Sequence, residues 1–335
     1  MIRRLFCLLL TCVLLLTACG QQEEESGSSA SSSEGASSAP SPAQSGQETA
    51  ANTPFTLAAC PSYSFHPVLA ESSANLTLAP LLYEGLFTLD RQFQAVPQLC
   101  QSYTVSADSL TWTFTLQSGV TFSDGTPLTG EAAAQALQIA RGEGSRYAAR
   151  LASVSSIQGS GNQVVITLTQ ANGALPQLLD IPIALGTGDR PLGTGPYVLT
   201  DSGGSLSLTA RSDWWQGAED LPIQQIALSS MTRSEEVMSA FNAGEITLMD
   251  VDLTGSSALG SSGRYQVWDY NTTQLLYVGF NTQRGLCRDI QVRKGIAQAI
   301  NREEVANTIF ARLALPASLP MQPDSPRYGQ AIGEE

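Results

Sequence analysis

Few side chains in this sequence could carry out acid–base or nucleophilic chemistry. His66 is the sole histidine and Lys294 the sole lysine among the 335 residues. A Ser-His-Asp triad or a multi-histidine metal site would therefore have to use His66, and a Schiff base would have to use Lys294. The G-x-S-x-G and H-E-x-x-H patterns of hydrolases are missing. The sequence thus disfavours a secreted hydrolase, and we expect neither a catalytic residue nor a metal or other cofactor.

Two glycine-rich stretches could suggest a cation or phosphate site. The stretch "SDGTP" (123–127) offers one carboxylate, Asp124, whereas a calcium loop needs several oxygen ligands in close register. The stretch "GTGDRPLGTGP" (186–196) lacks the lysine of a phosphate loop and does not satisfy G-x-G-x-x-G. Neither stretch predicts nucleotide or metal binding.

The first of these loops is better explained as a connection between two elements. Trp112, Phe114 and Leu116 alternate with threonines, which predicts a half-buried strand before the loop. Asp-Gly followed by proline favours a turn. Thr129 is a suitable N-cap for the alanine-rich helix that follows, and Glu131 favours its first turn.

Similar patterns predict further elements along the chain. Residues 163–169 and 205–210 alternate as strands. Thr232 and Glu235 have capping-box spacing before a helix that ends at Gly244, after which Ile246 and Leu248 predict a strand. Near the end of the sequence, Asn301 and Glu304 predict a capped helix with buried apolar side chains, namely Val305, Ile309 and Phe310. This irregular mixture indicates a mixed α/β fold.

The first 54 residues read as export and anchoring signals. Two arginines and an apolar run lead to "LTAC", which resembles the lipobox of bacterial lipoproteins, with Cys19 as the lipidated residue. Residues 20–54 are rich in Ser, Gly and Glu and predict a disordered tether. We therefore expect residues 1–19 to be a signal peptide with lipobox, and the protein to be anchored by lipid to the outer face of the bacterial cell membrane. The alternatives are an ordinary cleaved signal peptide or a short anchor, with the cysteine there by chance.

Charge and cysteine content narrow the expectations further. The formal net charge of −13 makes nucleic acid an unfavourable partner. Cys60, Cys100 and Cys287 remain after the signal peptide and Cys19 are set aside. One disulfide is possible, most plausibly between Cys60 and Cys100, and buried free cysteines are equally compatible with the sequence.

Five stretches, taken in order, resemble the extracytoplasmic solute-binding proteins of peptide- and nickel-type ABC importers (family 5). Two of them depart slightly from the family pattern: Gly130 and Ala132 stand where alanine and a second acid are usual, and Asn301 stands for aspartate. The stretches are "PLLYEGLFTLD" (80–90), "WTFTLQSGVTFSDGTPLTGEAAAQAL" (112–137), "PLGTGPYVLT" (191–200), "ARSDWWQG" (210–217) and "VGFNTQRGLCRDIQVRKGIAQAINREE" (278–304).

The resemblance implies a type II periplasmic-binding-protein fold, in which strands cross a hinge between two lobes that close on a ligand. By this analogy, residues 55–72 and 190–268 form the first lobe, 73–189 its accessory domain, and 269–335 the start of a second lobe that is truncated here. It also implies capture of a short peptide or related small solute, delivery to an ABC permease with its ATPase, and a monomer. The alternatives are a surface lipoprotein that senses peptides or acts as a scaffold, and a non-functional truncated paralogue.

The resemblance also suggests which residues contact the ligand, each with a structural alternative. Tyr63 and His66 follow the first expected strand, where the family's loop borders the cleft; the alternative for His66 is a loop histidine before Pro67. Tyr277 and Asn281 lie where the crossing segment meets the cleft; strand packing and a turn cap are their alternatives. Tyr197 follows the Gly-Thr-Gly-Pro turn, where core packing is the stronger expectation. Structural roles are likewise expected for three other residues of the matched stretches, namely Glu84, Trp214 and Trp215.

Overall fold

The computed structural model describes residues 55–219, 221–250, 265–268, 270, 272, 274–310, 312–321 and 328. The expected signal peptide, Cys19 and the tether lie outside the described residues. Within the described part of the chain, no helix has the length and apolar character needed to span a bilayer.

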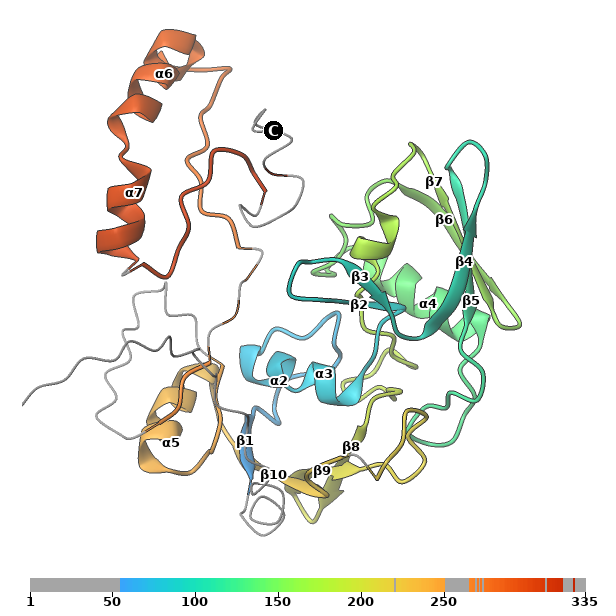
Figure 1. Ribbon diagram of the computed structural model, residues 1–335. Coiled ribbons are helices and arrows are strands. Elements are labelled where there is room, and N and C mark those ends of the chain that lie inside the picture. Colours follow the sequence, from blue (N-terminus) through green and yellow to red (C-terminus); the bar gives the residue numbers. More distant parts are fainter. Residues whose placement is uncertain are drawn as a thin grey trace, which may run out of the picture. The chain divides into compact units, whose positions relative to one another are not determined.

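The first of two four-stranded sheets joins the beginning of the described chain to a segment far along it. Its strand order is β1 (Thr56–Ala59), β10 (Gln225–Ser230), β9 (Ser205–Ala210) and β8 (Tyr197–Ser202) (Figure 1). β1 pairs in parallel with β10, and the other pairs are antiparallel. The alternation predicted over 205–210 is confirmed, since Leu206 and Leu208 are buried in the core of this sheet. The sheet therefore brings the carboxyl ends of β1 and β10 together.

Two short helices pack on the same core. α2 (Ser73–Thr77) begins at the N-cap Ser72, and α3 (Ala79–Leu82) follows it directly. Leu78 and Leu82 are buried among the strands of the first sheet. α3 and the residue Leu78 that precedes it therefore contribute to the core of the first sheet, whereas Val68, earlier in the chain, is buried in the core of the second sheet.

The second sheet forms a separate core with the alanine-rich helix. Its antiparallel order is β4 (Cys100–Val105), β5 (Thr111–Leu116), β7 (Gln163–Leu168) and β6 (Val154–Ser160). A hairpin of β2 (Phe87–Leu89) and β3 (Ala95–Pro97) and a short 3₁₀ turn, η1 (Leu175–Leu178), adjoin it. Phe114 and Ile166 are fully buried together with Leu137 of α4 (Gly130–Arg141). The predicted strand, turn and helix of residues 111–141 are therefore confirmed.

The start of α4 approaches the second sheet unusually closely. Thr129 caps the helix as predicted, because its Oγ1 accepts a hydrogen bond from the backbone N–H of Ala132 at 3.2 Å. A Cβ at Gly130 would overlap the carbonyl oxygen of Gln163, and a Cβ at Gly159 would overlap the carbonyl oxygen of Gly130. The glycine found here in place of the usual alanine is therefore a steric requirement of this packing.

The helix α5 (Val237–Ala243) corrects two details of the sequence interpretation. A 3₁₀ turn, η2 (Ser234–Glu236), precedes it, so the backbone N–H of Thr232 donates to Glu236 Oε2 at 2.9 Å and not to the predicted Glu235. Gly244 ends the helix with φ 76° as predicted. The strand expected through Ile246 and Leu248 is wrong.

A side chain replaces the ladder that this strand would need. The N–H of Thr247 donates to the carbonyl of Thr56 at 2.8 Å, and the N–H of Thr56 donates to Thr247 Oγ1 at 3.0 Å. Because the hydroxyl occupies the place of a backbone acceptor, pairing with β1 stops after one residue. Ile246 is nevertheless buried, in a small core beside α5.

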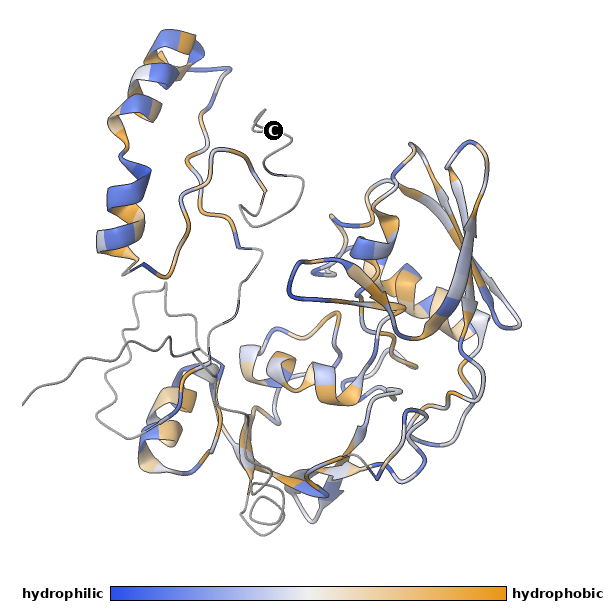
Figure 2. Cartoon of the chain, in the orientation of Figure 1, coloured by the Kyte–Doolittle hydropathy of each residue, from blue (hydrophilic) through white to orange (hydrophobic). Residues whose placement is uncertain are grey.

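The C-terminal described segment is helical, with exposed apolar groups. A 3₁₀ turn, η3 (Leu286–Arg288), leads to α6 (Ile290–Ala299), and α7 (Arg302–Glu304) continues into the π-helical turn η4 (Val305–Ile309). Asn301 caps α7 as predicted, accepting from the N–H of Glu304 at 3.1 Å. The expected burial of Ile309 is wrong, because 71% of it is exposed. Figure 2 shows hydrophilic and hydrophobic residues interspersed along α6 and α7.

Candidate functional site

The carboxyl ends of the parallel strands β1 and β10 form the candidate ligand surface of the first sheet. β1 continues into residues 60–66, here called the β1 loop, and β10 continues into residues 231–233. In open α/β sheets, ligands bind outside the carboxyl ends of the strands. Tyr63 is 42% exposed on the β1 loop, and Arg233 is exposed after β10. These two residues place an aromatic ring and a cation at the ends of adjacent strands.

The chemistry of this pair suits an amphipathic ligand with a negative group. The phenol of Tyr63 can stack on an apolar group and also form a hydrogen bond. Arg233 Nε lies 3.8 Å from Glu236 Oε1, which is a long contact between two exposed groups. Such a pair contributes little stability, so the guanidinium can exchange this partner for a carboxylate.

Asn75, which the sequence analysis did not single out, fastens the β1 loop. It lies in α2, and only 2% of it is exposed. Its Oδ1 accepts a hydrogen bond from the N–H of Cys60 at 2.8 Å. Its Nδ2 lies within hydrogen-bond distance of three backbone carbonyl oxygens, those of Cys60 at 2.9 Å, Tyr63 at 3.3 Å and Ser64 at 3.2 Å. One buried amide therefore joins a helix to most of the loop.

His66 lies at the end of the same loop but is buried. Its Nδ1 accepts a hydrogen bond from the N–H of Val68 at 3.2 Å. Burial lowers the pKa of the imidazole, an effect that the backbone at Gly186 partly offsets, so His66 is neutral at neutral pH. Its Nε2 has no hydrogen bond of normal geometry within the described part of the chain. His66 therefore presents no open surface to a ligand in this conformation.

The other three expected contact residues lie in different settings. Tyr197 is buried, and its hydroxyl donates to the carbonyl of Ile223 at 2.9 Å, which is a core-packing arrangement. Asn281 Oδ1 accepts from the N–H groups of Gln283 and Arg284 at 3.0 and 3.1 Å, so it caps a turn. Tyr277 is 79% exposed. The described contacts bring none of these three residues to the β1 loop.

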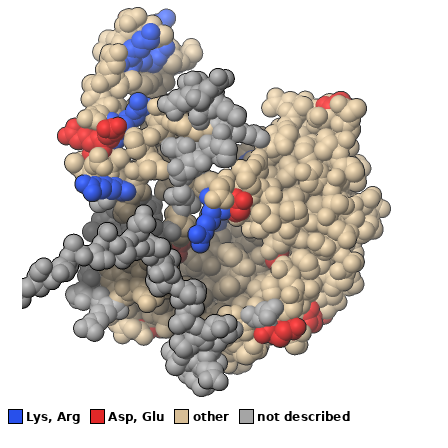
Figure 3. Space-filling model, viewed as in Figure 1, with Lys and Arg blue, Asp and Glu red and all other residues tan. Residues whose placement is uncertain are grey.

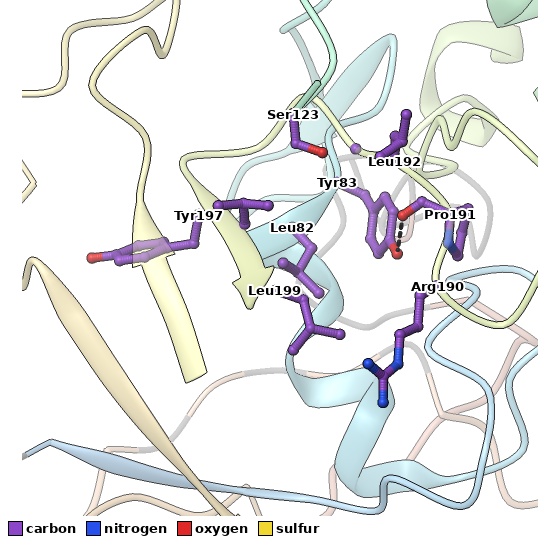
Figure 4. Close-up of a pocket in the computed structure, with 10 residues that line it drawn as sticks. Leu82, Tyr83, Ser123, Arg190, Pro191, Leu192, Tyr197 and Leu199 are labelled. Atoms are coloured by element: carbon purple, nitrogen blue, oxygen red, sulfur yellow. Dashed lines mark hydrogen bonds between the residues drawn. The ribbon is translucent and has the colours of Figure 1, made fainter. Parts of the chain in front are cut away.

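A small cavity lies between α3, β8 and the glycine-rich turn (Figure 4). It encloses about 70 Å³, which is room for water but far less than the roughly 300 Å³ or more of a ligand pocket. The hydroxyl of Tyr83 donates to the carbonyl of Pro191 at 3.1 Å, and burial raises the pKa of this phenol well above its usual range. The ring of Tyr197 points away from the other labelled side chains. This cavity is therefore not a candidate for peptide binding.

Four of the matched stretches converge on one place, here called the junction, which consists of residues 83–85, 121–123, 193–195 and 211–216. Glu84 is buried there, and its two carboxylate oxygens accept hydrogen bonds from Trp215 Nε1 at 2.9 Å and Gln216 Nε2 at 3.1 Å. Burial raises the pKa of Glu84, although the Trp215 indole, the Thr194 hydroxyl and other nearby donors counteract part of this effect. Glu84 therefore has the structural role that was predicted for it.

Arg211 is the second buried charge of the junction. Its guanidinium donates to three backbone carbonyls, those of Thr121 at 3.2 Å, Gly195 at 3.4 Å and Phe122 at 3.1 Å. It also donates to both carboxylate oxygens of Asp213 at 3.1 Å, which lowers the pKa of that carboxyl. The matched stretches therefore carry a structural joint between two cores, and Ser123, the first residue of "SDGTP", belongs to it through a bond from its N–H to the carbonyl of Gly193 at 2.9 Å.

The three described cysteines are free, so the possible Cys60–Cys100 disulfide is wrong. The reason is their placement. Cys60 is buried in the small core beside α5, whereas Cys100 is buried in the core of the second sheet. The alternative of buried free thiols is confirmed for both residues.

The described residues can be compared with the requirements of a metal site and of a surface that binds polyanions. No group of three or more His, Cys, Asp or Glu side chains in the described part of the chain is placed to hold a metal ion. On the face seen in Figure 3, the lysine and arginine side chains are scattered and form no continuous patch. The β1 loop and the end of β10 therefore remain the candidate ligand surface.

Comparison with known protein families identifies the family of this chain. Residues 94–335 match the model of the bacterial extracellular solute-binding proteins, family 5. The chain belongs to family 5. A Brucella ovis protein whose name assigns it to ABC-transporter peptide binding is 28% identical over 279 residues, which are 76% of this chain and 52% of that protein. The nickel-binding periplasmic protein of Escherichia coli K12 is 25% identical over 344 residues, covering 86% of this chain and 65% of the relative.

Solved structures agree on the fold. NikZ from Campylobacter jejuni in complex with Ni(L-His) aligns with a TM-score of 0.58 at 17% identity, over 80% of this chain and 57% of NikZ. The oligopeptide-binding protein AppA from Bacillus subtilis, in complex with a nonapeptide, aligns with a TM-score of 0.57 at 18% identity, over 82% and 59% of the chains. The chain thus has the mixed α/β, type II periplasmic-binding-protein fold and spans about half the length of several curated family 5 relatives it matches.

Proposed function

We propose that this family 5 protein is the lipid-anchored receptor of an ABC importer, which captures short peptides and delivers them to a permease and its ATPase. The observation that carries the proposal is the match to family 5 over most of the described chain. The name of the Brucella ovis relative refers to peptide binding. A peptide is also the ligand class that best suits an exposed tyrosine and an exposed arginine at adjacent strand ends.

In the proposed mechanism, the ligand is captured when the two lobes close on it. A ligand that contacts both lobes shifts the open–closed equilibrium by its extra affinity for the closed state. In the proposed complex, Arg233 pairs with the peptide's terminal carboxylate and Tyr63 packs against a side chain. No bond is broken, so this function requires no nucleophile and no general base.

Ligand-dependent stabilisation of the purified full chain tests the substrate class. Thermal unfolding is followed with a defined pool of di- to hexapeptides, with glutathione, and with nickel–histidine as separate probes. At 100 times Kd a bound ligand adds about 2.7 kcal/mol to the free energy of unfolding, which is easily measured. We expect stabilisation by the peptide pool, and a weaker effect on Tyr63→Ala, whose exposed ring contributes little to folding.

Other outcomes separate the parts of this proposal. Stabilisation by nickel–histidine alone would refute the peptide assignment but keep solute capture. No stabilisation by any of the three probes would contradict receptor function for this chain. The anchor is tested separately, since radiolabelled palmitate should enter the wild-type chain in cells and not the Cys19→Ala variant.

A further inference from the structure

The β1 loop depends on bonds from outside itself. A turn bond from the N–H of Tyr63 to the carbonyl of Cys60, at 3.0 Å, and local bonds around Ser64 and His66 give it only short-range order. The N–H of Phe65 donates to the carbonyl of Asp189 at 2.7 Å, which fixes the far end. Between these points, Asn75 is the side chain that reaches the backbone of Cys60, Tyr63 and Ser64.

The amide of Asn75 meets requirements that aspartate and alanine cannot. Its oxygen accepts from the N–H of Cys60, while its two N–H groups serve carbonyl oxygens of the loop. Aspartate has the same shape but no donor, and it would place a carboxylate beside the carbonyl oxygens of Cys60, Tyr63 and Ser64. Alanine would leave all of these buried groups without this partner, and buried backbone groups are strongly penalised when unpaired.

The backbone of Asn75 is fixed independently of the loop. Its N–H donates to the hydroxyl of Ser72 at 3.4 Å, at the start of α2. The next helix, α3, is buried on the first sheet through Leu82. The position of the Asn75 amide therefore comes from the packed core, and the amide transmits that position to the loop that carries the exposed ring of Tyr63.

We propose that Asn75 is the positioning residue of the ligand surface: its buried amide fixes the β1 loop so that Tyr63 is held ready for the incoming peptide. This rests on the proposed function, since Tyr63 must contact ligand for its position to matter. Asn75 itself touches no ligand. Because Asn75 orders the loop before the ligand arrives, binding does not have to include the entropic cost of ordering it.

Two readouts on the full chain test the proposal. The variants are Asn75→Asp, which keeps the shape, and Thr129→Ala, a control that removes a helix cap in the other core. The first readout is the rate of thiol labelling under native conditions, resolved by mass spectrometry for Cys60, at the start of the loop, and Cys100, in the second core. Both thiols are fully buried in the wild type. The second readout is the apparent affinity for the peptide pool, from the shift in thermal unfolding.

We expect Asn75→Asp to label at Cys60 at least tenfold faster while the rate at Cys100 stays unchanged. We also expect its peptide affinity to fall at least tenfold, whereas Thr129→Ala stays within twofold of the wild type. Equal acceleration at both cysteines would overturn the proposal, because it would report general destabilisation. Equal losses of affinity in the two variants would overturn it as well.

The two readouts also distinguish failure of this inference from failure of the proposed function. If the wild type responds to no probe, receptor function fails and the positioning role fails with it, whatever the labelling shows. If the wild type binds the peptides and Asn75→Asp binds them equally well, the positioning role alone fails. Retained affinity together with fast labelling at Cys60 would mean that the loop is fastened by Asn75 but is not used by the ligand.

Discussion

Replacing Arg211 by alanine tests whether the junction holds the two cores together. The guanidinium makes six hydrogen bonds, to Thr121, Phe122, Gly195 and Asp213, at 3.0 to 3.4 Å. Four of these bonds reach residues that lie 16 to 90 positions away in the sequence. The substitution therefore removes bonds that no neighbouring side chain can replace.

The magnitude follows from burial. The guanidinium donates two buried hydrogen bonds, to the carbonyls of Gly195 and Phe122, and a hydrogen bond to a charged group contributes about 1.5–3 kcal/mol. After the substitution the carbonyl of Phe122 keeps its bond from the N–H of Gly125, and Asp213 is exposed to water, so the buried carbonyl of Gly195 is the main group left without this partner. Water that enters the space left by the side chain offsets part of this, so we expect about 3–5 kcal/mol in total. For a domain of this size that corresponds to a fall in Tm of roughly 6–20 °C.

Urea unfolding and thermal unfolding measure this loss, with Arg150→Ala as the matched control. Arg150 pairs with the partly exposed Asp180, and its guanidinium carbon lies 5.1 Å from the centroid of the Tyr147 ring, so its removal should cost about 1 kcal/mol. Arg211→Lys keeps the charge but not the planar fork, and should lie between the wild type and Arg211→Ala. A variant Arg211→Ala as stable as the Arg150→Ala control would refute the structural role assigned to the junction.

Two further predictions concern the junction. Gly193→Ala should lower the free energy of unfolding by about 1–3 kcal/mol, because the new Cβ overlaps the carbonyl of Leu82, whereas Gly188→Ala, where a Cβ meets open space, should change it by less than about 0.5 kcal/mol. Equal effects in chemical denaturation would contradict the packing described. Since burial raises the pKa of Glu84 in the folded state, its contribution to stability is full below the unfolded-state pKa and is lost as pH rises through the folded-state pKa. The free energy of unfolding of the wild type minus that of Glu84→Gln should therefore fall as the pH rises from about pH 4, and a constant difference would show that Glu84 does not titrate in this range.

Local patterns in the sequence predicted the elements that depend on neighbouring residues. The alternation around Phe114 and Leu208, the cap at Thr129 and the left-handed ending at Gly244 all depend on residues a few positions apart. The strand through Ile246 failed because one hydroxyl, that of Thr247, takes the place of a backbone acceptor. No local sequence pattern shows that a side-chain hydroxyl will accept a hydrogen bond in place of a backbone carbonyl.

The candidate site was harder to predict because it depends on long-range contacts. The parallel pairing of β1 with β10 joins segments that are far apart in the sequence, and Asn75 lies in a short helix without any motif of its own. At the junction, Glu84 gave one usable signal, because it is a charged residue inside the otherwise apolar and aromatic stretch of residues 80–87. Tyr63 is the one predicted contact residue that lies exposed at the strand ends, whereas Tyr197 and Asn281 have the structural bonds that were given as alternatives.

The contact between Gly130 and Gly159 means that neither position can vary alone. Alanine at position 130, the usual residue of the family, would need the start of α4 to move away from the backbone at Gln163 and Ser160. Alanine at position 159 would need a similar movement, since its Cβ would overlap the carbonyl of Gly130. A side chain at either position therefore fits only if the start of α4 lies farther from the sheet. Comparing relatives one position at a time would count Gly130 as a departure from the pattern, whereas comparing the two positions together should reveal a correlated pair that records how tightly this helix is packed.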